Sequence, residues 1–456
     1  MASSFSRRDL LKALGISLGA TALPVSSWAT TETGVPILLP DEAQHPPLSK
    51  PVTAITLGAG NRGNVYGNYA VQYPDQLDIV GVAEPIAIRN ERYALKHQIP
   101  AQRRFNTWEE VFRQPKFADA IIITTPDDLH YGPCMKALEM GYDVLLEKPI
   151  SPSEQECRNI LALAQKTGRI VAVCHVLRYA PYFMALRKLV QSGVLGELIS
   201  VQHLEPIERV HMSHSYVRGN WHNSQKTAPI ILAKSSHDLD ILRWLVGEPA
   251  EQISAFGNLK WFRSENAPNG STARCTDGCA VEASCPYSAL KIYYRERTYN
   301  YVFDLPEAKE QQAAFVLEQL KTTNYGRCVY RMENDQPDHY VANIQFRNGA
   351  TASFSMEAFT SYHGRRTRIM GSMGDVVGDM TSYVFTDFLT GKQTEFKQST
   401  DGHGGGDWRL VADWLQAVAQ QNPALLSSTI EASIESHLMG FAAEKSRKNS
   451  SVEQLS

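Results

Sequence analysis

The run VTAITLGAGNRG, residues 52–63, decides the fold of this chain. Its apolar first half, Val52 to Leu57, is typical of a buried parallel strand, and the three glycines that follow form a turn into a helix. Gly58 permits the tight turn, Gly60 lets the backbone approach a pyrophosphate, and Gly63 lets the helix pack closely on the strand. A helix N-terminus binds phosphates because its free N–H groups point at them. The run therefore predicts a dinucleotide-binding site.

A second apolar stretch, Leu77 to Val82, predicts a strand that leads to the carboxylate of Glu84. A carboxylate at that place accepts hydrogen bonds from a ribose 2′-hydroxyl, so the sequence favours NAD over NADP. NADP is the less favoured alternative, because Arg62 or Arg89 has the charge to bind a 2′-phosphate. Asn61 and Arg62 lie within the glycine turn and are further candidates for cofactor contacts.

Strands and helices alternate from residue 51 to residue 178, which predicts a doubly wound parallel sheet of the Rossmann type. The pattern then changes, and alternating segments predict an antiparallel sheet in a second α/β domain, residues 179–456. The expected strands are 52–57, 77–82, 117–123, 142–146 and 169–173, followed by 198–204, 342–346, 351–356 and 366–370. The expected helices include 134–140, 153–166, 181–192, 407–420 and 429–447.

The first 29 residues have the features of an export signal. Arg7 and Arg8 precede an apolar stretch, 13–25, that is too short to span a bilayer, and Ser27-Trp28-Ala29 fits a cleavage site. The pattern predicts twin-arginine export of the folded protein to the periplasm or outside, with an uncleaved anchor or a free tail as alternatives. A protein that is exported after folding with NAD leaves the cytoplasm with its cofactor bound. We therefore expect the cofactor to be held tightly and to return to its starting redox state in each turnover. Residues 30–50 have the composition of a linker.

The charge balance of the chain limits its partners. Its 456 residues carry 45 Lys and Arg against 48 Asp and Glu, a formal net charge of −3. Without a basic run, the sequence gives no reason to expect nucleic acid or an anionic membrane surface as a partner. No stretch after the signal looks like a membrane-spanning helix.

Two further motifs resemble those of a known family. Thr125-Pro126-Asp127-Asp128-Leu129-His130, followed by Glu147-Lys148-Pro149, resembles the signature of the Gfo/Idh/MocA family of glucose–fructose oxidoreductase and inositol dehydrogenase. The resemblance covers residues 51–450. It implies a Rossmann domain joined to an α/β domain with a large open antiparallel sheet, and homo-oligomers that often pair through that sheet. It also implies NAD(P)-dependent chemistry on sugars and polyols, with some members acting as glycosidases that use NAD transiently.

The resemblance also assigns residues around the nicotinamide. Lys148 carries the family's lysine, and an ammonium at the carboxyl edge of the parallel sheet can hydrogen-bond the hydroxyl being oxidised. A salt bridge to Glu147 is the structural alternative for this lysine. Thr125, Pro126, His130 and Glu147 are expected near the cofactor as well.

A second signature, LAKSSHDLDILRWL, occupies residues 232–245 on a predicted helix. In the family, a histidine at the position of His237 acts as acid/base. Many relatives carry an aspartate four residues earlier, where this chain has Ala233, with Lys234 beside it. The ammonium groups of Lys234 and Lys148 would lower the pKa of a nearby imidazole and favour its proton-accepting form. Asp238 is a second candidate base, and a hydrogen-bonded core histidine is the alternative for His237.

Candidate substrate residues lie at and after the domain junction. Tyr179 is placed where the chain crosses into the second domain, and a polar loop carries Arg218, Asn220, Trp221 and His222. Such a set suits a sugar, because an aromatic ring covers C–H faces while amide and guanidinium groups bind hydroxyls. Packing at the junction and a solvated loop are the respective alternatives.

The seven cysteines form two groups. The first group is predicted to act as small buried hydrophobes and comprises Cys134, Cys157 and Cys174. The second group lies in turn-rich segments and comprises Cys275, Cys279, Cys285 and Cys328. Four thiolates can hold a structural zinc, while a disulfide or free thiols are the alternatives.

Three functions follow from these features. The leading interpretation is an exported NAD-dependent oxidoreductase with tightly bound cofactor, which moves a hydride between a carbohydrate carbinol carbon and nicotinamide. The second is a redox-neutral glycosidase, which makes a 3-keto sugar, eliminates the aglycone, adds water and re-reduces the product. The third is a non-catalytic binding protein that keeps NAD as a structural element.

Overall fold

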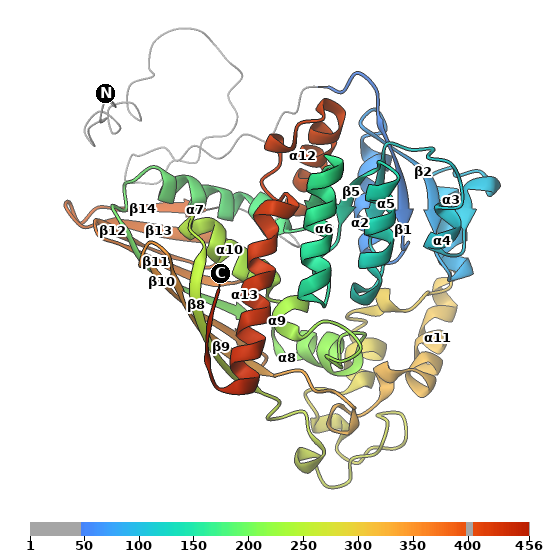
Figure 1. The fold of residues 1–456 in the computed structure, drawn as a ribbon. Helices are drawn as coiled ribbons and strands as arrows, with labels where there is room; N and C mark the ends of the chain where they lie inside the picture. Colours follow the sequence, from blue (N-terminus) through green and yellow to red (C-terminus); the bar gives the residue numbers. More distant parts are fainter. Residues whose placement is uncertain (1–46, 398–404, 456) are drawn as a thin grey trace.

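The computed structural model describes residues 47–397 and 405–455. The predicted export signal and most of the predicted linker, residues 1–46, lie outside the described residues, so both stay predictions. The described chain forms two α/β domains, and Figure 1 shows the open sheet of the second domain beside the parallel sheet of the first.

The first domain is built on six parallel strands in the order β3-β2-β1-β4-β5-β6. Strands β4 and β5 are fully buried, which explains their uninterrupted apolar sequences. The predicted doubly wound sheet is confirmed, and it has in addition a two-residue edge strand, β3. The strands are β1 (Val52–Leu57), β2 (Leu77–Ala83), β3 (Arg104–Phe105), β4 (Ala120–Ile123), β5 (Asp143–Leu146) and β6 (Val171–Val173).

Helices cover both faces of this sheet. They are α2 (Asn61–Gln72), α3 (Ala87–Lys96), α4 (Trp108–Val111), α5 (Tyr131–Glu139), α6 (Glu154–Thr167) and α12 (Gly406–Gln420). Helix α6 begins where the Ser153 side chain accepts a hydrogen bond from the Glu156 N–H, as expected of a serine cap. Helix α12 returns from the end of the chain and packs Leu410 and Trp414 into the same apolar cluster as Tyr66. The first domain is thus completed by residues that the sequence assigned to the second.

The second domain contains nine strands in the order β14-β13-β12-β11-β7-β10-β9-β8-β15. Strands β7 and β10 pair in parallel and all other neighbours pair antiparallel, so the predicted, mainly antiparallel sheet is confirmed. The strands are β7 (Leu198–Pro206), β8 (Ala250–Asn258), β9 (His339–Phe346), β10 (Thr351–Glu357), β11 (Arg366–Gly371), β12 (Gly374–Gly378), β13 (Ser382–Asp387), β14 (Gln393–Lys397) and β15 (Val452–Gln454).

Helices lie on one face of this sheet, between it and the first domain (Figure 1). The larger ones are α7 (Pro181–Gln191), α10 (Ser236–Val246) and α13 (Ile430–Asn449), and the short ones are α8 (Arg209–His211) and α9 (Ile230–Ala233). The strands alternate accordingly, since Tyr340 and Ala342 of β9 are buried under helices while Val341 between them is exposed.

Residues 259–338, which join β8 to β9, form an insert with a small core of its own. It contains α11 (Lys309–Thr322) and several short turns, and Tyr293, Phe303 and Leu320 lie in its core. Figure 1 shows this yellow-to-orange segment beneath α3 and α4 of the first domain. Among the described residues, no helix is long and apolar enough to cross a membrane.

Candidate active site

The three glycines after β1 have three different surroundings. Gly58 has a φ of +91°, and a Cβ there would lie 2.7 Å from the Thr124 carbonyl oxygen. A Cβ on Gly63 would lie 2.1 Å from the Gly58 oxygen, so the helix can approach the strand only without one. A Cβ on Gly60, in contrast, would meet no atom within 4 Å. The turn is therefore tight at both ends and open in the middle, which fits a pyrophosphate lying over Gly60.

Glu84 is held at the edge of the same turn. It is buried, and its carboxylate accepts hydrogen bonds from the Ala59 N–H (2.8 Å) and the Ile86 N–H (2.9 Å). A carboxylate has about four lone-pair directions, so two remain for ribose hydroxyls. The observed position fits the expected ribose contact.

Arg62 connects three elements instead of facing the ribose edge. Its guanidinium contacts Glu147 (2.5 Å) after β5 and Asp407 (2.6 Å) of α12, while the Tyr66 hydroxyl donates to Glu147 (2.8 Å). Although burial opposes ionisation, Arg62 and Lys148 hold the pKa of Glu147 below its usual range. Strand β5 lies on the opposite side of β1 from β2, so Arg62 points away from a 2′-phosphate.

His130 joins the two turns that follow β4 and β5. Its Nδ1 lies 2.7 Å from the Pro149 carbonyl oxygen and its Nε2 lies 2.9 Å from that of Thr125. The Thr125 hydroxyl donates to the Leu129 carbonyl (3.0 Å). These residues fix the shape of the strand ends beside Lys148.

Lys148 links the two domains. Its Nζ donates a hydrogen bond to the carbonyl oxygen of Ala233 (2.6 Å), at the end of α9. Burial lowers the pKa of Lys148 and Lys234 adds to this effect, whereas Glu147 opposes it. Lys148 therefore meets a backbone oxygen of the second domain at the position where the resemblance led us to expect an aspartate.

Lys234 and Asp238 belong to one chain of paired charges. Lys234 lies at the break between α9 and α10, and its Nζ is 3.1 Å from Glu205 of β7. Arg365 bridges Glu205 (2.7 Å) and Asp238 (2.5 Å), and the His203 ring lies 3.0 Å from Asp238. Burial alone would raise the pKa of Asp238, but Arg365 and His203 hold it well below the usual range. A carboxylate committed to a guanidinium is a poor proton acceptor, which argues against Asp238 as the base.

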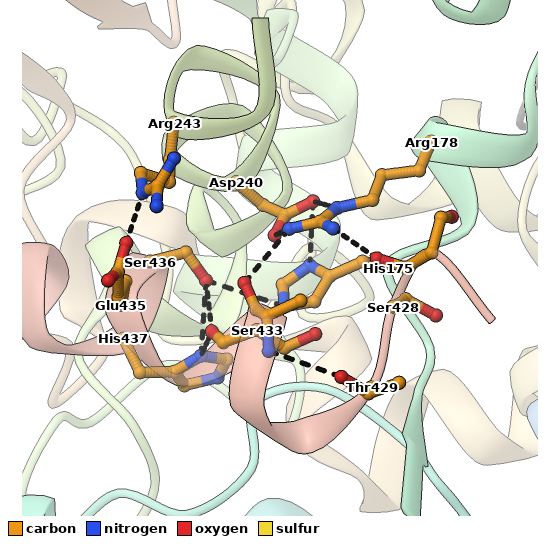
Figure 2. A network of polar contacts seen from close by, with 12 residues as sticks. His175, Arg178, Asp240, Arg243, Ser428, Thr429, Ser433, Glu435, Ser436 and His437 are labelled. Atoms are coloured by element: carbon orange, nitrogen blue, oxygen red, sulfur yellow. Dashed lines mark hydrogen bonds and ion pairs between the residues drawn. The ribbon is translucent and has the colours of Figure 1, made fainter. Parts of the chain in front are cut away.

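His237 lies in the first turn of α10 and is 4% exposed. The ring centroids of His237 and His175 are 6.0 Å apart, and those of His175 and His437 are 5.5 Å apart. Figure 2 shows His175 and His437 beside the ion pair of Asp240 with Arg178 (2.6 Å). Asp240 thus anchors α10 to the domain junction.

His211 is a further candidate that the sequence interpretation did not name. It lies on α8, and burial followed by Lys234 lowers its pKa well below the usual range, with Lys148 contributing. No local sequence pattern separates His211 from the neighbouring His214.

Two family models match nearly the whole of the described chain. A model of an oxidoreductase family with an NAD-binding Rossmann fold matches residues 53–175, and the model of its C-terminal α/β domain matches residues 187–454. The chain belongs to the Gfo/Idh/MocA oxidoreductase family.

Individual relatives are more distant. YteT of Bacillus subtilis (strain 168), an oxidoreductase by name, is 25% identical over 325 residues, which cover 68% of this chain and 74% of YteT. Inositol 2-dehydrogenase of Corynebacterium glutamicum is 28% identical over 201 residues, covering 44% of this chain and 56% of that enzyme. The solved structure of levoglucosan dehydrogenase with NADH has a TM-score of 0.67 at 14% identity, covering 89% of this chain and all of that one.

In this Gfo/Idh/MocA chain, the expected substrate residues separate into two groups. Trp221 Nε1 donates to the buried Asp127 carboxylate (2.9 Å) and so joins the polar loop to the end of β4. Asn220 is exposed, and the His222 ring lies 2.7 Å from the Gly219 oxygen within the loop. These three positions stay candidates for substrate contact.

Tyr179 and Arg218 have structural surroundings. Tyr179 is buried at the domain junction, and its hydroxyl lies 3.0 Å from the Ser428 hydroxyl. This position fits packing at the junction, which was the alternative to a substrate contact. Arg218 is 1% exposed and donates to the carbonyl oxygens of Arg327 (2.8 Å) and Tyr287 (2.7 Å). A guanidinium enclosed in this way supports the insert, so its surroundings favour a structural role for Arg218 over substrate contact.

The second cysteine group surrounds this guanidinium. Cys275, Cys279, Cys285 and Cys328 all line one cavity with Arg218. Across the described ranges, no cysteine forms a disulfide and no three metal-binding side chains have the arrangement of a metal site. Burial raises the pKa of Cys285 and Cys328, which favours neutral thiols. The expectation of a structural zinc is therefore not supported, whereas Cys134, Cys157 and Cys174 are buried as small hydrophobes are.

Proposed function

We propose that this chain is an exported NAD-dependent oxidoreductase that acts on a hydroxyl-bearing carbon of a sugar or polyol and holds its cofactor tightly. The observation that carries the proposal is Lys148, which follows β5 at the carboxyl edge of the parallel sheet and reaches the second domain at Ala233. A lysine whose pKa is lowered at such a junction is suited to proton transfer with an alcohol. The relatives named as inositol and levoglucosan dehydrogenases support a polyol or sugar as the substrate.

The residues divide the work as follows. Gly60 and Glu84 would hold the pyrophosphate and the ribose, and bound nicotinamide would supply hydride acceptance and return. When substrate binds, Lys148 Nζ leaves the Ala233 carbonyl oxygen and forms a hydrogen bond with the substrate hydroxyl. The neutral amine then accepts the proton of that hydroxyl. His211 and His237 are the two candidate partners in that transfer. The Lys234–Glu205 pair offers both a donor and acceptors for further hydroxyls.

Replacing Lys148 tests the proposal directly. The purified protein is denatured, any released nucleotide is identified by mass, and sugars are screened by the absorbance of reduced nicotinamide. We expect wild-type protein to release NAD, and Lys148→Met to keep the nucleotide while turnover falls about a hundredfold to ten-thousandfold. Absence of any bound or binding nucleotide would overturn the proposal. An unchanged rate in the variant would favour a protein that keeps NAD without catalysis.

A redox-neutral glycosidase is the second candidate. An elimination cycle needs an additional acid and base, and His237 and His211 supply imidazoles that can take those roles. Incubation with aryl glycosides separates the two candidates, because a glycosidase releases the phenol without net formation of NADH.

Export is tested separately from chemistry. Cell fractionation of the full chain is compared with a variant in which Arg7 and Arg8 are both replaced by Lys. We expect the wild-type chain outside the cytoplasm and the variant inside it. Equal distribution of the two would overturn the export part alone.

A further inference from the structure

The insert contacts the first domain next to the ribose edge of the cofactor turn. Arg89 Nε of α3 donates to Asp304 of the insert (2.7 Å), and Arg92 donates to the Leu305 carbonyl oxygen (3.0 Å). Both contacts lie on the helix that follows Glu84. The insert is therefore attached to the helix that follows the end of β2, the strand end at which NAD and NADP are distinguished.

Arg89 is the cation placed to read a 2′-phosphate. It follows Glu84 by five residues, and the Glu84 carboxylate is one of the charges that act on it. Partial burial disfavours its charge, but the hydrogen bond to Asp304 raises the pKa of Arg89 above its usual value. Arg62, the other arginine considered for this task, is paired with Glu147 and Asp407 on the far side of β1.

The pairing with Asp304 changes what Arg89 can bind. A 2′-phosphate is bound best by a cation whose donors and charge are available, and here Asp304 accepts a hydrogen bond from Nε of Arg89 and offsets its charge. A phosphate at this place would also face the negative charges of both Glu84 and Asp304. A ribose 2′-hydroxyl meets neither obstacle.

We propose that Asp304, a residue of the insert, determines the preference for NAD over NADP by occupying Arg89. The inference rests on the proposed function, because it requires a dinucleotide in the glycine turn. It differs from the expectation based on Glu84 alone, since it assigns cofactor choice to the second domain as well. The same ion pair joins the insert to α3, so removing it is expected to lower the affinity for both NAD and NADP. The informative quantity is therefore the ratio of the two affinities.

The experiment measures dissociation constants of NAD and NADP by the change in intrinsic fluorescence of the nucleotide-free protein. Asp304→Asn should raise the affinity for NADP relative to NAD by about tenfold. Glu265→Gln is the matched control, since Glu265 is an exposed insert carboxylate paired only within the insert, with Arg263 (2.8 Å). It removes the same charge and should leave the ratio unchanged.

A second variant covers the case in which Asp304→Asn does not fold. Because Arg89 is already occupied, Arg89→Gln should leave the NAD-to-NADP ratio within about twofold of wild type. A large loss of NADP affinity in Arg89→Gln, or equal ratios in Asp304→Asn and Glu265→Gln, would overturn the inference. If wild-type protein binds neither nucleotide, the proposed function fails instead.

Discussion

The role of Gly60 can be distinguished from the roles of Gly58 and Gly63 by substitution. A methyl group on Gly60 meets no protein atom within 4 Å, so Gly60→Ala should fold with unchanged stability. The same methyl group occupies the space proposed for the pyrophosphate, and the affinity for NAD should fall at least about tenfold. Titration of nucleotide-free protein with NAD, together with a thermal melt, measures both quantities.

Gly63→Ala is the matched control. Its Cβ would lie 2.1 Å from the Gly58 oxygen, so the variant should be destabilised before any nucleotide is added. If Gly60→Ala bound NAD as wild type does, the open space over Gly60 would not be the phosphate site.

Lys148 carries a prediction about pH. Burial lowers its pKa below 10.5, so the neutral amine is present at lower pH than for an exposed lysine. If the neutral amine takes the proton of the alcohol, the oxidation rate should fall as the pH drops below this lowered pKa. Lys148→Arg keeps a cation that does not deprotonate, so turnover should fall at least about a hundredfold. The pH profile of kcat/KM measures the effect, and an arginine variant with the wild-type profile would contradict it.

At this scale, the sequence identified residues that belong to local motifs. Lys148, Glu84 and the glycines each stand in a short pattern with a fixed place at a strand end. Glu205 and Arg365 do not, because Glu205 of β7 meets Lys234, and Arg365, just before β11, meets Glu205 and Asp238, only in the folded chain. Arg365 lies more than a hundred residues from both Glu205 and Asp238, and Glu205 and Lys234 belong to different motifs, so no spacing rule connects this set.

Helix α10 is fixed by an ion pair at the domain junction (Figure 2). Arg178 Nε and Nη2 donate to the two oxygens of Asp240 (2.7 and 2.6 Å), and both side chains are buried. Asp240→Asn leaves the guanidinium without its counter-charge, so the free energy of unfolding should fall by about 3–5 kcal/mol. Urea-induced unfolding measures the change.

Glu435, a partly exposed residue at the edge of this network, provides the control. It pairs with Arg243 of α10 and its side chain is 35% exposed. Glu435→Gln should change the free energy of unfolding by less than about 1 kcal/mol, because solvent screens exposed pairs. Equal losses in the two variants would mean that burial of the Asp240 pair does not matter.

The elements differ in how well the sequence predicts them, for a physical reason. Strands β1, β4 and β5 are buried on both faces and appear as uninterrupted apolar runs. Strands β12 and β13 are only five and six residues long, and β13 has a single buried residue, so their signal is weak. The insert has almost no regular periodicity, and its placement over α3 depends on single contacts such as Asp304 with Arg89.

At the scale of the whole molecule, the junction between the domains is rich in buried neutral histidines. His437 of α13 accepts a hydrogen bond at Nε2 from the Ile150 N–H (2.9 Å), while its Nδ1 faces the Ser433 carbonyl oxygen (3.2 Å). This arrangement requires an unprotonated Nε2. Burial, followed by His175, lowers the pKa of His437 from 6.5 to about 3.

His437 therefore makes the folded protein sensitive to mild acid. Between about pH 6.5 and about pH 3, the unfolded chain binds a proton at His437 and the folded chain does not, so stability falls as the pH falls. The contribution of one such group is about 1.4 kcal/mol per pH unit. His437→Gln should be less stable near neutral pH, because its hydrogen bonds are imperfect, but its free energy of unfolding should decline less steeply. Urea unfolding at about pH 7 and about pH 5 measures both slopes, and identical slopes would show that His437 is already charged in the folded protein.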